Sequence, residues 1–387
     1  MTTASATAVL VSPTSAPGGA ERALLNLARL LPKHNVATFV LLLQPGPFEE
    51  WLRDAGVDYE VVAMGRTRQV HRTLPVMARL ATRSRRANVV VTNQGKGHAI
   101  AGPVPFVVGK PVIWWQHGIP GHSRIDRIAA RVPAAAVVCG SKAALRAQHC
   151  LTPRRQVVLI HPGTDLGAVR AATGSGAAIR SRYGIGEAPF VGIVARLQAW
   201  KGQELFLRAA ALVLQKVPAC RFAVVGGAVL GWEGNYPADL RTLARALKLD
   251  DRVIFAGHQP DTYPWFDAID IAITASVGEP FGLVTVEAMA LGTPVVGVES
   301  SGTAEIIEHG TSGILVPPDD PAAMAAAIVD LLADSNRRQR ISDAAALRAQ
   351  TFSSHSTASR FADLIASITG LESTSAHDAV PAPQRID

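Results

Sequence analysis

Short apolar runs recur along this chain of 387 residues, and each is followed by a segment with the periodicity of an amphipathic helix. Strands that are buried on both faces have this appearance, and helical connections between them make the pairing parallel. The sequence therefore predicts an α/β protein with two doubly wound parallel sheets. The strands expected in the first sheet are residues 8–12, 37–43, 59–63, 89–92, 112–116, 136–139 and 157–160, and those of the second are residues 190–194, 221–225, 253–255, 271–275, 295–298 and 313–316.

The two series are separated by residues 162–176, which are rich in Gly, Ala and Thr. With 48% apolar residues, the chain can bury a core on each side of this break. We expect one Rossmann-like domain at residues 1–165 and a second at residues 166–352. A final helix is expected within residues 353–370, and a disordered tail at residues 371–387.

Two glutamates, Glu279 and Glu287, bracket the start of the helix that should follow the strand at residues 271–275. Glu279 belongs to the strand-to-helix loop, at the carboxyl edge of the sheet, where α/β proteins bind ligands. Phe281, Gly282 and Leu283 present N–H groups at the helix start, which is an anion site. The arrangement suits a sugar nucleotide, with amides for the diphosphate and carboxylates for the ribose and the sugar. A capping glutamate followed by an ordinary helix-surface glutamate is the alternative.

Two cations lie in the loop expected after the strand at residues 190–194. Arg196 and Lys201 precede a helical segment that begins at Gln203, so they also belong to the carboxyl edge of the second sheet. A diphosphate leaving group gains negative charge when a glycosidic bond breaks. A fixed guanidinium and ammonium would stabilise that charge in the transition state. A solvated basic loop is the alternative interpretation.

Glycines and histidines mark other strand ends. Gly19, in the glycine pair after the first strand, lets the backbone approach a diphosphate or an acceptor; no third glycine completes a dinucleotide fingerprint. His117 follows the strand at residues 112–116 and could donate to a sugar hydroxyl, with a structural histidine as the alternative. Gly226 and His258 follow two strands of the second sheet and are weaker signals.

Taken in this order along the chain, the motifs resemble those of retaining glycosyltransferases with the GT-B fold, in the large glycosyltransferase family 4. Glu279 and Glu287 match the E-x7-E signature of that family, and the run Gly-Leu-Val-Thr-Val-Glu-Ala-Met-Ala-Leu-Gly-Thr-Pro around Glu287 strengthens the match. Arg196 and Lys201 match the pattern G-R-L-x-x-x-K-G, except that Ala195 replaces the glycine before the arginine.

The resemblance implies two Rossmann-like domains that face a central cleft, with the last helix crossing back to the first domain. It also implies that Arg196 and Lys201 bind the donor diphosphate, that Glu287 binds the ribose and that Glu279 binds the transferred sugar. His117 aligns with the family's active-site histidine, near the C6 hydroxyl of the donor sugar. The remaining positions expected near the donor are Gly19, Phe281, Gly282, Leu283, Gly226 and His258, the last two in loops that flank the nucleotide base.

These matches predict a retaining glycosyltransferase that moves a sugar from a nucleotide-diphosphate donor to a saccharide, lipid-linked or small-molecule acceptor, in bacterial glycolipid or polysaccharide synthesis. No Asp-x-Asp motif is present, so neither a divalent metal nor another cofactor is expected. Two alternatives remain. A nucleotide-sugar epimerase or a phosphorylase can share the fold, and a non-catalytic protein that binds sugar nucleotides would belong to a different class.

The chain carries a formal charge of +7, to which one segment, residues 66–86, contributes strongly. The segment contains no acidic residue and reads as a basic amphipathic helix, which predicts contact with an anionic membrane or an anionic acceptor. A solvated helix face is the alternative. Nucleic acid is not expected as a partner, because few aromatic residues lie nearby. The arginines of the segment are Arg66, Arg68, Arg72, Arg79, Arg83, Arg85 and Arg86.

The same sequence argues for an intracellular location. No apolar run reaches the roughly 20 residues that span a bilayer, and residues 2–20 lack the pattern of a signal peptide. Cys139, Cys150 and Cys220 are an odd number and widely spaced, which fits reduced cysteines. We therefore expect a cytoplasmic protein in peripheral contact with the inner face of the cell membrane.

Overall fold

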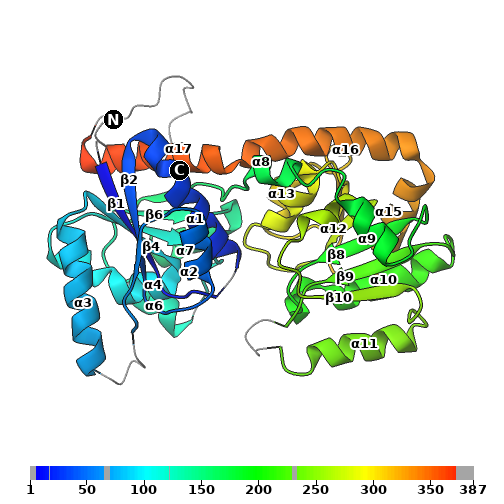
Figure 1. Ribbon diagram of the computed structural model, residues 1–387, viewed down its shortest axis with the longest axis horizontal. Helices are drawn as coiled ribbons and strands as arrows, with labels where there is room; N and C mark the ends of the chain where they lie inside the picture. The colour runs from blue at the N-terminus through cyan, green and yellow to red at the C-terminus, as the bar shows by residue number, and fades with distance from the viewer. Residues whose placement is uncertain (1–5, 17, 65–69, 122, 229–232, 372–387) are drawn as a thin grey trace. The chain divides into compact units, whose positions relative to one another are not determined.

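The computed structural model describes residues 6–16, 18–64, 70–121, 123–228 and 233–371. By its internal contacts the chain divides into two compact units (Figure 1). Unit 1 comprises Met1–Gly163 together with Ser354–Asp387, and unit 2 comprises Thr164–Ser353. The final helix therefore belongs with the amino-terminal unit, whereas the predicted tail lies outside the described residues apart from residue 371.

Unit 1 is built on a parallel sheet of seven strands in the order β3-β2-β1-β4-β5-β6-β7. The order reverses between β1 and β4, which makes the sheet doubly wound and places a topological switch point at their carboxyl ends. The strands are β1 (Ala6–Ser12), β2 (Val36–Leu42), β3 (Tyr59–Val61), β4 (Val89–Asn93), β5 (Val112–Gln116), β6 (Ala136–Cys139) and β7 (Val157–Leu159).

Helices cover both faces of this sheet, because alternate residues of each buried strand point to opposite sides. Leu10 packs with α1, α2 and α17 on one face, whereas Val9 packs with α3 and α4 on the other. The helices of unit 1 are α1 (Gly19–Leu30), α2 (Phe48–Asp54), α3 (Val70–Arg85), α4 (Gln94–Ala101), α5 (Pro103–Val107), α6 (Arg124–Ala129), α7 (Lys142–Leu151) and α17 (Ser354–Thr369), with a 3-10 turn η1 (Leu31–His34) after α1.

Unit 2 has a parallel sheet of six strands in the order β10-β9-β8-β11-β12-β13. Its switch point lies between β8 and β11, the strands that precede the two loops carrying the predicted cations and carboxylates. The strands are β8 (Phe190–Val194), β9 (Arg221–Val225), β10 (Val253–Gly257), β11 (Ile271–Thr274), β12 (Val295–Val298) and β13 (Ile314–Val316).

The helices of unit 2 also lie on both faces of their sheet (Figure 1). Ile193 packs with α10, α11 and α15, whereas Phe190 packs with α12, α13 and α16. These helices are α8 (Leu166–Arg170), α9 (Gly176–Arg182), α10 (Gln203–Leu214), α11 (Tyr236–Ala246), α12 (Tyr263–Ala268), α13 (Leu283–Ala290), α14 (Thr303–Ile306), α15 (Pro321–Ala333) and α16 (Ser335–Ala349), with 3-10 turns η2 (Ala199–Lys201) and η3 (Gln350–Phe352).

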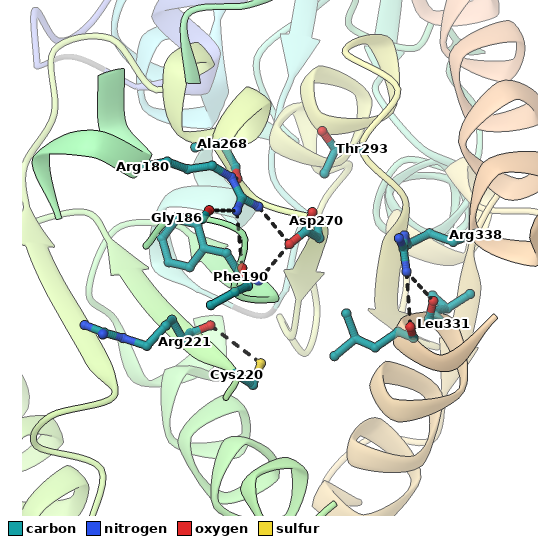
Figure 2. Close-up of polar contacts among 12 residues, drawn as sticks. Arg180, Gly186, Phe190, Cys220, Arg221, Ala268, Asp270, Thr293, Leu331 and Arg338 are labelled. Carbon is teal, nitrogen blue, oxygen red and sulfur yellow. Dashed lines mark hydrogen bonds and ion pairs between the residues drawn. The ribbon is translucent and has the colours of Figure 1, made fainter. Parts of the chain in front are cut away.

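One arginine closes the amino-terminal edge of the unit 2 sheet (Figure 2). Arg180 donates from Nε to the carbonyl of Ala268 at 2.8 Å and from Nη1 to the carbonyl of Gly186 at 2.9 Å. Its Nη2 lies 2.8 Å from Asp270 Oδ2, which also accepts the Phe190 N–H. The side chain thus fixes the first residue of β8 against the residue that precedes β11, on the edge opposite the candidate site.

The predicted fold class is confirmed, and every predicted strand is present with its ends within two residues. The apolar stretch 99–115 contributes to α4, α5 and β5, and α5 was not predicted. Among the described residues, no helix is both long and apolar enough to cross a membrane. Cys139 and Cys220 are buried and Cys150 is exposed, all three as free thiols.

Candidate active site

The structure joins a predicted cation to a predicted carboxylate at the carboxyl edge of the unit 2 sheet. Lys201 Nζ lies 2.6 Å from Glu279 Oε2, although the two residues are 78 positions apart. Each side chain is only 11% exposed, so the ion pair is largely removed from water. Lys201 also lies over the ring of Trp200, with Nζ 4.1 Å from the ring centroid.

Close packing of two loops produces this pair. Gly202 has φ +74°, a backbone conformation that favours glycine, and a Cβ at this position would lie 2.2 Å from the Ala275 carbonyl oxygen. The N–H of Val277 donates to the Trp200 carbonyl at 2.9 Å. The loop after β8 and the loop after β11 are therefore in direct backbone contact, which fixes Lys201 beside Glu279.

A third loop, which follows β12, is hydrogen-bonded to the loop that carries Glu279. The N–H of Gly302 donates to the Glu279 carbonyl at 2.9 Å, and Ser300 Oγ accepts the Gly278 N–H at 2.9 Å. A Cβ on Gly302 would lie 2.3 Å from the Cα of Phe281, so a larger residue would displace this loop. Sequence reasoning missed Ser300 and Gly302, although their place after a predicted strand of the same sheet was a usable signal.

Arg196 lies at the start of the loop that carries Lys201. Its carbonyl accepts a hydrogen bond from Gln203 Nε2 at 2.8 Å, which ties the beginning of the loop to the first residue of α10. The preceding residue, Ala195, packs against Gly226, where a Cβ would lie 1.9 Å from the Ala195 carbonyl oxygen. Gly226 is therefore required by close approach of the backbone, beside a predicted donor-binding arginine.

The positions predicted near the base also come together. A Cβ on Gly227 would lie 2.9 Å from the Cβ of His258, and the Gly226 N–H donates to the Gly257 carbonyl at 2.9 Å. The loops after β9 and β10 are thus neighbours, and His258 is exposed on them.

The second glutamate of the pair lies inside α13, as predicted. The helix begins at Leu283, one residue earlier than expected, with Gly282 as its N-cap at φ +104°. Glu287 is buried at 5% exposure, so it is not an ordinary surface residue of the helix. Phe281 is buried beside Phe352, with the ring centroids 5.5 Å apart, which anchors the segment leading into the helix.

The electrostatics of this edge are governed by the burial of Lys201. Burial lowers the pKa of the Lys201 ammonium, the neighbouring Glu279 carboxylate raises it, and the like charge of Arg196 lowers it. An additional anion, such as a diphosphate, would hold the ammonium in its charged form. The edge is therefore suited to binding a polyanion with two cations. Among the described residues, no group of three or more His, Cys, Asp or Glu side chains is arranged to hold a metal.

Unit 1 places His117 directly after β5, where its Nε2 lies 2.6 Å from Oδ1 of Asn93 at the end of β4. The imidazole also packs on Trp115, with ring centroids 4.4 Å apart. Burial lowers the pKa of His117 to about 3, so the ring is neutral at physiological pH. Because Asn93 Oδ1 is an acceptor, Nε2 carries the proton and Nδ1 is the acceptor nitrogen. Asn93 was not singled out in the sequence.

Glu21, which follows the glycine pair of unit 1, is linked to Gln94, a side chain that the sequence did not indicate. Glu21, in the first turn of α1, is 4% exposed, and its Oε1 accepts a hydrogen bond from Gln94 Nε2 at 2.9 Å. Gln94 follows β4 with φ +62°, a left-handed conformation that is uncommon outside glycine. Gly19 is the first residue of α1.

Comparison with known proteins shows what the chain is similar to. Residues 177–348 match the family described as Glycosyl transferases group 1. A solved structure of Anabaena HepE in complex with UDP-glucose superposes with a TM-score of 0.84 and 27% identity, covering 94% of this chain and 100% of that one. Most of unit 2 is therefore similar to this glycosyltransferase family, and the two parallel sheets have the GT-B fold of two Rossmann-like domains.

Curated relatives of the family match over a shorter stretch. D-inositol 3-phosphate glycosyltransferases are 34% identical over 218 residues in Thermobispora bispora and 35% identical over 219 residues in Corynebacterium kroppenstedtii. Each match covers 55% of this chain, and the chain spans about half the length of these relatives, 50% and 46%. A sucrose-phosphate synthase from Thermosynechococcus elongatus, with 20% identity and a TM-score of 0.76, shares the fold.

Proposed function

We propose that this protein is a group 1 glycosyltransferase, specifically a retaining hexosyltransferase that transfers a sugar from a UDP-sugar to a hydroxyl group of a saccharide or lipid-linked acceptor. The observation that carries the proposal is the buried pair of Lys201 and Glu279, with Arg196 on the same loop as Lys201. It combines cations for a diphosphate with a carboxylate for a sugar hydroxyl at one sheet edge, next to the start of α13.

In the proposed reaction, the bond between the sugar C1 and the diphosphate oxygen breaks. Arg196 and Lys201 stabilise the negative charge that then develops on the diphosphate. The acceptor oxygen forms a bond to C1 on the face that the diphosphate leaves, so the configuration is retained. The acceptor proton passes to a diphosphate oxygen, and UDP departs. This route needs neither a protein nucleophile nor a metal ion.

The other predicted residues have binding roles in this proposal. Glu287, buried on α13, accepts hydrogen bonds from the ribose hydroxyls, and Glu279 holds the transferred sugar. The N–H groups of Phe281, Gly282 and Leu283 contact the diphosphate, as helix starts do for anions. For unit 1, we retain the predicted contact of His117 with the sugar and of the Gly19 loop with the donor.

The choice of a uridine nucleotide is supported by HepE, solved with UDP and with UDP-glucose at 26% and 27% identity. The test is a panel of UDP-, GDP- and ADP-sugars, with release of the nucleotide measured with and without candidate acceptors. We expect release only from UDP-sugars, and nuclear magnetic resonance of the product should show the anomeric configuration of the donor. An inverted product, or a preference for GDP- or ADP-sugars, would contradict the proposal.

The same assay separates the alternatives. An epimerase would convert the donor without an acceptor, and a phosphorylase would require inorganic phosphate. A binding-only protein would bind UDP in calorimetry but release nothing from any donor with any acceptor.

We propose that the enzyme meets its acceptor at an anionic membrane surface on the cytoplasmic side. The predicted basic segment 66–86 is only partly available for this contact. Arg83 Nη2 lies 2.7 Å from Glu60 Oε2, Arg79 pairs with the other oxygen of Glu60, and Arg83 lies over Phe39. These two arginines hold α3 to the sheet. Arg85 and Arg86 are exposed, whereas residues 65–69 lie outside the described residues.

A further inference from the structure

The positive charge of the protein is concentrated in one part of unit 1. Residues 61–164 contain 16 Lys and Arg but a single acid, Asp126, which gives them a formal charge of +15. The rest of the chain, with 22 Lys and Arg and 30 Asp and Glu, carries −8. The excess therefore does not arise from an evenly basic composition, and it extends well beyond the basic helix α3.

Exposed apolar side chains occur in the same region. Phe106 and Val107 on α5 are 58% and 81% exposed, and Ile125 and Ile128 on α6 are 39% and 50% exposed. Ile125 and Ile128 are three positions apart, so they occupy one face of their helix. Large apolar side chains at this exposure, grouped on short neighbouring elements, are typical of interaction surfaces.

Both helices pack on α4, and residues that flank them lie close together. A Cβ on Gly102, which directly precedes α5, would lie 2.8 Å from a methyl carbon of Val132, three residues after α6. Val132 is held in turn by His98 of α4, whose Nε2 lies 3.2 Å from the Val132 carbonyl oxygen. We call the exposed side chains of these helices, together with Arg131 just after α6, the α5–α6 surface: Phe106, Val107, Arg124, Ile125, Arg127, Ile128 and Arg131.

Cations surround the apolar side chains of the α5–α6 surface. Arg124, Arg127 and Arg131 are exposed, and none of them forms an ion pair with any other residue that the structure describes. Arg131 Nη1 donates to the Arg127 carbonyl at 3.0 Å. Asp126 is engaged locally, since its Oδ2 accepts from Ser123 Oγ at 2.7 Å and from the Gly121 N–H at 3.1 Å. Arg124 also lies in the first turn of α6, where the helix dipole disfavours a cation, so its charge does not stabilise the helix.

We propose that the α5–α6 surface docks on an anionic lipid membrane, with its apolar side chains inserted between headgroups and its arginines paired with lipid phosphates. Unpaired cations beside exposed apolar groups match the two components of such an interface. The inference rests on the proposed function and deepens it. It places the membrane contact next to α4, which begins at Gln94, and near β5, which His117 follows. It assigns the main contact to α5 and α6 instead of α3.

The test is sedimentation of the full-length protein with vesicles of phosphatidylcholine alone or mixed with phosphatidylglycerol. Wild type should bind only the anionic vesicles, and added salt should weaken the binding. R124Q/R127Q should reduce the partition coefficient about 25-fold, at about fivefold for each arginine. F106S/V107S should reduce it by about tenfold or more through lost apolar burial. Thermal melting checks that both variants are folded.

Two control variants match the charge change. R337Q/R340Q, on α16 of unit 2, should leave vesicle binding within about twofold of wild type, since about 1 kcal/mol per residue applies only near the lipid surface. R85Q/R86Q, on α3, should have a smaller effect than R124Q/R127Q. A larger effect of the α3 variant, or equal effects of all the charge variants, would overturn the assignment of the contact to α5 and α6.

Insertion is tested separately with F106W and brominated lipids, which should quench its fluorescence more than that of wild type. No additional quenching would overturn the insertion of α5. If the surface were instead an interface between two copies, wild type would sediment as a dimer without vesicles and F106S/V107S as a monomer, which would also overturn the proposal. Turnover with a soluble acceptor mimic is measured in parallel: vesicle binding without transfer contradicts only the proposed function, and transfer without vesicle binding contradicts only the docking.

Discussion

Replacing Glu279 by Gln should tighten the binding of UDP while it slows the transfer of the sugar. In the structure the Lys201 ammonium is 2.6 Å from the Glu279 carboxylate, so the cation proposed to bind the diphosphate already has an anionic partner. A diphosphate must share or displace that partner, and it is also repelled by the carboxylate. The amide of Gln is close to the same size and removes both obstacles.

The magnitude follows from the burial of the pair. Two unit charges at 4 Å attract by about 4 kcal/mol at an effective dielectric constant of about 20, and the desolvation of both ions offsets much of that gain. A net difference of about 1–2 kcal/mol remains, which corresponds to a dissociation constant for UDP lowered about 5- to 30-fold. Turnover should fall about 10- to 100-fold, because the sugar loses a charge-assisted hydrogen bond worth about 1.5–3 kcal/mol.

The assay is calorimetric titration of UDP into wild type, Glu279→Gln and Glu287→Gln, with steady-state turnover measured alongside. Glu287→Gln is the matched control, because it removes the same charge from the same helix region but should weaken UDP binding through the ribose. The two glutamates of one motif are therefore expected to change the affinity in opposite directions. Weaker or unchanged UDP binding by Glu279→Gln would refute the account of the Lys201 pair.

The variant should also respond differently to pH. Glu279 raises the pKa of Lys201, whereas burial and Arg196 lower it. Without the carboxylate, the Lys201 pKa falls, and the ammonium loses its proton at a lower pH. The UDP affinity of Glu279→Gln should consequently decline on the alkaline side before that of wild type. Parallel pH profiles would indicate that Lys201 does not contact the nucleotide.

Four further predictions concern separate parts of the molecule. Arg196→Ala and Lys201→Ala should each lower turnover about 100- to 1,000-fold without unfolding, as for a lost transition-state donor, and near-wild-type rates would contradict the site. Activity should survive excess EDTA, unless Mg²⁺ or Mn²⁺ alone proves able to restore a chelated enzyme. Arg180→Ala should cost about 1.5–3 kcal/mol in urea unfolding and leave UDP affinity unchanged. Burial lowers the pKa of His98 to about 4, so only the unfolded state gains its proton as the pH falls from about 6.5 to 4. Over that pH range the unfolding free energy of wild type should fall by up to about 3 kcal/mol more than that of His98→Gln.

The strands could be predicted from the sequence because both faces of each are buried, which leaves a continuous apolar run. Helix α5 and much of α4 could not, since residues 94–107 contain three glycines within the first nine positions and two prolines. Tertiary packing decides there. A Cβ on Gly97 would lie 3.1 Å from the Pro13 ring, so the glycine lets α4 approach the end of β1. Poor local propensity is overridden by this contact.

The sequence was sufficient to place the site at one edge of the sheet, but not to predict which of its side chains contact each other. The alternation of strands and helices placed Arg196, Lys201 and Glu279 at the carboxyl ends of strands, and Glu287 in the helix that follows. That Lys201 would bond Glu279, and not a solvent molecule, depends on the contact of Gly202 with Ala275. Packing at this level has no signal in the spacing of residues along the chain.

The glycine pair of unit 1 was noticed in the sequence, but the sequence did not show why glycine is needed at position 18. Gly18 is extended, with φ −168°, so its conformation does not require glycine. A Cβ there would instead lie 2.9 Å from Glu21 Oε2, while Gln94, 73 residues away, bonds the other carboxylate oxygen. Moving Glu21 aside to admit a larger residue would cost that hydrogen bond within a buried site. Gly18 and Glu21 are therefore coupled through Gln94, so a change at Gln94 should relax the requirement for glycine at position 18.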